Sequence, residues 1–144
     1  MSVVVDVWQA ALATEHAAVA GYDVAGPHLD DADAATARAD QQAHRSSRDA
    51  TSAALAAAGH TPVPARPDYP LPFPVADAAT ARRLALDLES ACAAAWRYLI
   101  AVAGPSDRDL RDNAQAALTA SALRALQWRR LVDPAKPTVP FPGI

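Results

Sequence analysis

Four polar residues fall at positions where the spacing of apolar residues predicts the buried faces of helices. They are Glu15, Gln41, His44 and Glu89. Gln41 and His44 are three residues apart, so they share one side of a helix. An ionised carboxylate in a dry protein core is unfavourable unless it is paired with a cation or bound to a metal. Carboxylates and a histidine are also ligands of iron and manganese.

A dinuclear metal centre is the first chemistry that this spacing suggests. In a bundle of four helices that binds two iron or manganese ions, two helices each supply a Glu, and the other two each supply a Glu-x-x-His motif. Here Gln41 stands where the first motif needs a carboxylate, and residues 113–132 contain no Asp, Glu or His. Two carboxylates and one histidine are too few for this centre, so we expect no metal and no cofactor.

Two arginines offer another cation for the buried carboxylates. Arg48 and Arg124 fall on the same predicted faces, and a guanidinium group can meet a carboxylate at two points. The sequence therefore predicts a buried polar network in place of a metal site. Its expected members are Glu15, Gln41, His44, Arg48, Glu89 and Arg124.

A single metal ion is the alternative to this network. Glu15, His44 and Glu89 could be three ligands on one face of a single iron or manganese ion. This would be a degenerate mononuclear site of a metal-binding protein or oxidoreductase. If the buried positions are instead shifted by one residue along a helix, Glu15 or Glu89 lies at the edge of the core and contacts water. Cys92, one turn after Glu89, is expected to be a small buried hydrophobic residue. No residue is assigned a catalytic role, which favours a protein that is not an enzyme.

Composition and charge limit the classes of function. Half of the residues are apolar, alanine is abundant and strand-forming residues are few, which predicts an all-α protein. A net charge of −3 gives no basic surface for nucleic acid. The most apolar run contains Arg97 and is too short to span a membrane. No signal peptide is recognisable at the start, so we expect a cytoplasmic protein.

The prolines divide the chain into four predicted helices within one domain, residues 1–144. The helices are expected at about residues 3–26, 31–58, 78–103 and 107–132. Short connections make two antiparallel hairpins, and a long proline-rich crossover, residues 59–76, joins them. Two hairpins with one long crossover form a ferritin-like four-helix bundle. The prolines after residue 133 predict an extended C-terminal tail.

Several segments carry a family resemblance that spans nearly the whole chain. They are "EHAAVAGYDV", "AHRSSRDA", "YPLPFPV", "RALQWR" and the closing "PFPG". These segments resemble an uncharacterised ferritin-like family, a domain of unknown function. The resemblance implies a ferritin-like bundle, commonly paired as a dimer, and no settled activity. Compared with metal-binding ferritin-like proteins, the chain keeps Glu15, His44 and Glu89 but has Gln41 for a carboxylate and lacks the motif of the fourth helix.

These observations together predict a metal-free binding or interaction module that forms a homodimer. Three tryptophans add more aromatic surface than such an alanine-rich core needs, which favours a dimer. A small molecule bound between the alanine-rich helices is a further possibility, and its identity cannot be predicted from the sequence.

Overall fold

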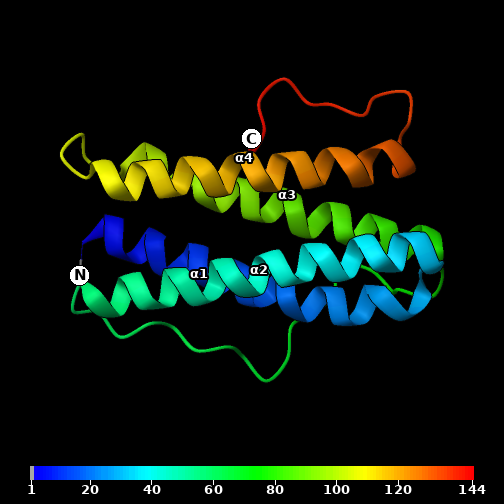
Figure 1. Cartoon of the computed structure of the whole chain (residues 1–144), viewed down its shortest axis with the longest axis horizontal. Helices are drawn as coiled ribbons and strands as arrows, with labels where there is room; N and C mark the ends of the chain where they lie inside the picture. The colour runs from blue at the N-terminus through cyan, green and yellow to red at the C-terminus, as the bar shows by residue number, and fades with distance from the viewer. Residues whose placement is uncertain (1) are drawn as a thin grey trace.

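The computed structural model describes residues 2–144 and contains four long helices and one short 3-10 turn (Figure 1). The elements are α1 (Val3–Ala25), the 3-10 turn η1 (Gly26–His28), α2 (Asp31–Ala57), α3 (Ala78–Val102) and α4 (Arg108–Val132). No strand occurs within residues 2–144. The predicted all-α four-helix architecture is confirmed, and the helix ends lie within a residue or two of those expected.

Side-chain caps fix where the first three helices begin. Ser2 accepts a hydrogen bond from the backbone N–H of Val5 at the start of α1, and Asp30 accepts one from Asp33 at the start of α2. Asp77 and Thr80 cap each other's backbone groups at the start of α3. These bonds satisfy backbone donors that have no partner within the helix, and they define the first turn of each helix.

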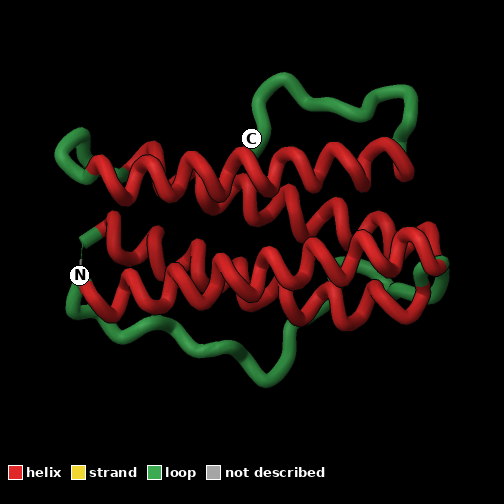
Figure 2. Tube along the Cα trace, viewed as in Figure 1, coloured by secondary structure: helices red, strands yellow, loops and turns green. Residues whose placement is uncertain are grey.

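The helices form two hairpins that pack side by side. α1 contacts both α2 and α3, and α3 contacts α4. The connection between α2 and α3 runs along the outside of the bundle from one end to the other (Figure 2). Gln9 and His16 of α1 hold it there through hydrogen bonds to the backbone of Thr61 and Val63. Within the described part of the chain, no helix is long and apolar enough to cross a membrane.

The apolar core is divided by a polar layer. One cluster contains Val7, Trp96 and Leu99, and a second contains Tyr22 and Trp128. Along α1, α3 and α4, the buried polar residues fall between the members of these two clusters. The four helices therefore position their polar side chains at mid-length, where water is excluded by apolar residues on both sides.

Candidate functional site

His44 of α2 is the centre of the polar layer. Its ring is fully buried, with 0% of its surface exposed. Nδ1 lies 2.6 Å from Oε2 of Glu15 on α1, and Nε2 lies 2.8 Å from Oε1 of Glu89 on α3. Both carboxylates are buried as well. One imidazole ring therefore lies directly between the two carboxylates that the sequence placed in the core.

This geometry makes His44 a cation. An ionised carboxylate can only accept hydrogen bonds, so each ring nitrogen that faces one must carry a proton. Burial by itself lowers the pKa of His44, but its hydrogen bonds with Cys92, Glu15 and Glu89 raise the pKa to about 12. At neutral pH the imidazolium form donates to Glu15 and to Glu89 at the same time.

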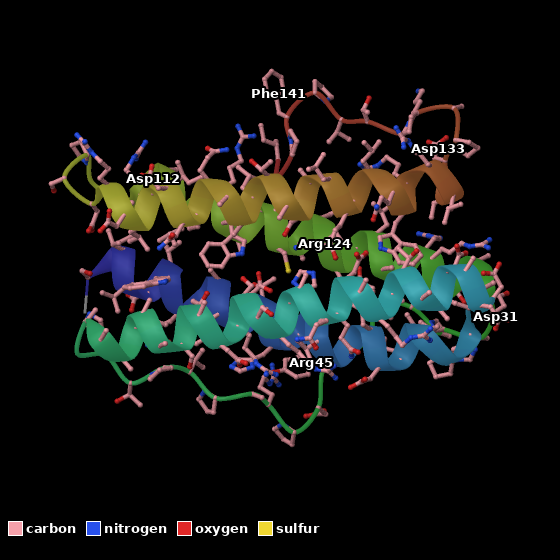
Figure 3. All side chains as sticks on the ribbon, in the orientation of Figure 1. Asp31, Arg45, Asp112, Arg124, Asp133 and Phe141 are labelled. Carbon is pink, nitrogen blue, oxygen red and sulfur yellow. The ribbon has the colours of Figure 1, made fainter. Side chains whose placement is uncertain are left out.

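Arg124 of α4 is the second cation of the network. Its Nε donates to Oε2 of Glu89 at 3.1 Å, and its Nη2 donates to the hydroxyl of Ser121 at 3.3 Å. Burial disfavours the charged guanidinium, but the neighbouring Glu89 carboxylate outweighs it and raises the pKa of Arg124. Figure 3 labels Arg124 on α4 and shows the polar side chains gathered between the helices. Glu89 thus lies between an imidazolium and a guanidinium.

Two aromatic donors complete the hydrogen bonding of the carboxylates. Trp96 Nε1 donates to Oε1 of Glu15 at 2.8 Å, and the Tyr22 hydroxyl donates to Oε1 of Glu89 at 2.7 Å. Across residues 2–144, no buried side-chain nitrogen or oxygen lacks a partner. The network is therefore fully satisfied by protein groups, which is the condition under which buried charges are tolerated.

Asp40 extends the network toward Trp128. Its Oδ2 accepts from Trp128 Nε1 at 2.9 Å, and the Tyr22 hydroxyl lies 3.4 Å away. Burial and the Glu89 carboxylate raise the pKa of Asp40. Four further members of the network were not predicted from the sequence: Asp40, Tyr22, Trp96 and Trp128. A usable signal existed, because each aromatic residue lies two helical turns from a buried polar residue on the same face.

Two of the residues expected in the network lie outside it. Gln41 is buried, but its Nε2 donates to the backbone oxygen of Val19 and to Oδ1 of Asp23, both at 2.8 Å. Arg48 pairs with its neighbour Asp49 through an Nε–Oδ1 contact of 2.9 Å and keeps 28% of its side chain exposed. Two members of the expected network are therefore corrected. Gln41 joins α2 to α1, and Arg48 lies nearer the surface, paired with the exposed Asp49.

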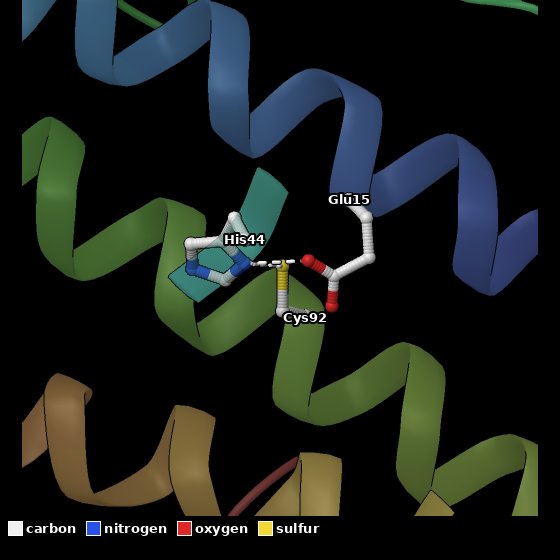
Figure 4. A group of neighbouring side chains, drawn as sticks. All are labelled: Glu15, His44 and Cys92. Atoms are coloured by element: carbon white, nitrogen blue, oxygen red, sulfur yellow. Dashed lines mark hydrogen bonds and ion pairs between the residues drawn. The ribbon is translucent and has the colours of Figure 1, made fainter. Parts of the chain in front are cut away.

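The same geometry decides which metal ligands converge. Glu15 and Glu89 contact opposite nitrogens of His44, so they cannot both join one His44 nitrogen around a single ion. Instead, ligand atoms of Glu15, His44 and Cys92 lie within 4.8 Å of one another, and Cys92 Sγ is 3.9 Å from His44 Nδ1 (Figure 4). Burial raises the pKa of Cys92 to about 12, so this group is a thiol at neutral pH.

The fold and the site together define a class: a four-helix bundle whose two central carboxylates are bridged by a histidine, with an arginine paired to one of them. Residues 7–144 match the family described as a domain of unknown function, DUF4439, and the chain belongs to this family. It is also similar to a conserved hypothetical protein, rv2844, from Mycobacterium tuberculosis, whose crystal structure is known. The identity is 34%, the TM-score is 0.84, and the match covers 89% of this chain and 96% of the other. No curated protein matches.

The charge of His44 should make stability depend on pH. Below its unfolded pKa of 6.5, His44 is protonated in both states and its full contribution is present. Between that value and the folded pKa of about 12, only the folded state holds the proton. Its contribution to the free energy of unfolding should then fall by about 1.4 kcal/mol per pH unit. Urea unfolding at several pH values should show this slope in the wild type and not in His44→Gln.

His28→Gln is the matched control, because His28 is exposed at the end of η1, and it should keep the wild-type slope. If His44→Gln does not fold, nitrogen-edited NMR of the wild type gives the same answer. Both ring nitrogens of His44 should carry protons at neutral pH, and a signal from a neutral tautomer would contradict the assignment.

Proposed function

We propose that this chain is a metal-free, ferritin-like bundle protein that acts as a binding module and not as an enzyme. The observation that carries this proposal is the position of His44, whose two nitrogens both contact carboxylates. In a ferritin-like metal protein, such carboxylates coordinate ions. Here an imidazolium and the Arg124 guanidinium take the place of the ions.

Charge balance supports the proposal. Glu15 and Glu89 contribute two negative charges, and His44 and Arg124 contribute two positive charges, so the four groups are neutral together. The neighbouring Asp40 carboxyl is less acidic than usual, because burial and the Glu89 carboxylate raise its pKa. A divalent ion would add charge beside an imidazolium and a guanidinium in a medium of low dielectric constant, which is strongly unfavourable.

Elemental analysis tests the metal-free state. Protein purified without chelator, then incubated with ferrous iron and with manganese and desalted, should hold far less than one ion per chain. Arg124→His is a useful comparison, because it removes the guanidinium beside Glu89 and adds a neutral ligand, so its metal content should rise above that of the wild type. Iron or manganese at one ion per chain in the wild type would refute the proposal.

A mononuclear metal site is the second candidate function. It is favoured by the convergence of Glu15, His44 Nδ1 and Cys92 Sγ, a set with the thiolate, imidazole and carboxylate ligands that zinc accepts. This set replaces the expected one of Glu15, His44 and Glu89. Binding would require His44 and Cys92 each to lose a proton, so it should strengthen as pH rises.

Titration with Co²⁺, followed by its thiolate charge-transfer absorption, should show no band in the wild type if the leading proposal holds. A band that Cys92→Ser abolishes would establish the metal site.

We also propose that the protein is a cytoplasmic homodimer. The support is the common pairing of ferritin-like bundles, together with large apolar side chains at the surface. Val3 and Tyr98 are 63% and 58% exposed and are candidates for the contact surface. Size-exclusion chromatography with light scattering should give the mass of two chains. The mass of one chain at every concentration tested would exclude the dimer.

A further inference from the structure

A cavity of about 500 Å³ lies on the outer side of the second hairpin, between α3, α4 and the C-terminal tail. We propose that this cavity binds a small amphipathic anion, namely an aliphatic carboxylate whose chain lies between the helices and whose head group meets arginine. The inference rests on the binding module proposed above and names the chemical class of its ligand. The cavity has a volume typical of small-molecule sites.

Small residues on facing helices create the space. Ala93 and Ala94 of α3 and Ala122 and Ala125 of α4 line the cavity, and their methyl groups fill little of the volume between two helix backbones. Leu118 and Leu126 add further apolar wall. The inner surface therefore suits a hydrocarbon chain, which gains free energy in proportion to the apolar area that it removes from water.

The C-terminal tail covers the cavity, and its last residues are held against α3. Arg97 Nη1 donates to the backbone oxygen of Pro142 at 3.0 Å. Gly143 has a φ of +86° and lies so close to α3 that a Cβ atom there would be 2.7 Å from the Ala93 backbone oxygen. The chain from residue 133 to this anchor arches over the hairpin (Figure 1), and prolines within it lack the N–H groups that could bond to the helices.

The charge of the lining selects an anion. Arg97 and Arg129 line the cavity, and no Asp or Glu side chain does so among the described residues. The last residue, Ile144, brings one main-chain carboxylate to the lining, so the two guanidinium charges still exceed the negative charge. Within residues 2–144, neither arginine forms a salt bridge, and Arg97 donates one hydrogen bond to the backbone of Pro142. A guanidinium beside an apolar cavity matches a carboxylate head group in charge and in hydrogen-bond geometry.

Calorimetric titration of the full chain tests the proposal with three probes that share one hydrocarbon chain: decanoate, decanol and decyltrimethylammonium. Decanoate should bind saturably at one site. Decanol should bind at least about tenfold more weakly, because it lacks the charge-assisted hydrogen bond to arginine. The cationic probe should bind no more tightly than decanol.

Two pairs of variants locate the site. Arg129→Gln should weaken decanoate binding at least about tenfold and leave decanol unchanged, while Arg130→Gln, at the neighbouring exposed position outside the lining, should bind as the wild type does. Ala122→Phe should fill the cavity and abolish binding of decanoate. Ala116→Phe, at an exposed position of α4 outside the lining, should have no effect. Circular dichroism confirms that each variant is folded.

Each other outcome overturns the inference. If decanoate does not bind saturably, aliphatic carboxylates are not the ligand. If decanoate and decanol bind equally well, arginine does not recognise the head group. If Ala122→Phe binds decanoate normally, the ligand does not occupy this cavity. If Ala122→Phe converts a dimer to a monomer, this face is an interface between copies of the chain. The metal content of the same samples separates this inference from the proposed function. Metal-free protein that binds no decanoate would refute the ligand class and leave the metal-free state standing. Metal-loaded protein that binds decanoate would refute the metal-free state and leave the ligand class standing.

Discussion

Two buried carboxylates that need a cation are the constraint on which this structure depends. Glu15 and Glu89 are both shielded from water, and each would be strongly unfavourable there without a positive partner. His44 contacts both. Because the three residues lie on α1, α3 and α2, this one imidazolium ties three helices together, and Arg124 ties the fourth helix to Glu89.

A buried network of this kind can determine which helix packing is adopted as well as how stable it is. Buried ion pairs are often no more stabilising than well-packed apolar residues, whereas the loss of one partner is costly. Much of the core of this bundle consists of alanine, and alanine faces can slide past one another with little change in packing. A ring of hydrogen bonds with defined partners penalises every other register, because a shifted helix would leave a buried charge unpaired.

The sequence predicts the helices and the burial of Glu15, His44 and Glu89, but not which polar residues contact one another. Apolar spacing and the prolines were enough for the fold. Gln41 is three residues before His44, which rotates it about 60° around α2 and turns it toward α1. Arg48 has a long side chain, and the adjacent Asp49 provides a nearer partner. The charge of His44 depends on contacts at both ring nitrogens from two other helices, which no local pattern encodes.

α4 connects the two parts of the molecule that carry its proposed functions. Ser121, Arg124 and Trp128 face the network, while Ala122, Leu126 and Arg129 face the tail. These two sets alternate with helical periodicity and so lie on different sides of one helix. In a metal-binding bundle the inner side of the fourth helix supplies ligands. Here the inner side supplies Arg124, whose positive charge pairs with the buried Glu89 carboxylate where a metal ion would otherwise be needed. The outer side, with its small residues, carries Arg129, which lines the cavity under the tail and forms no salt bridge within residues 2–144.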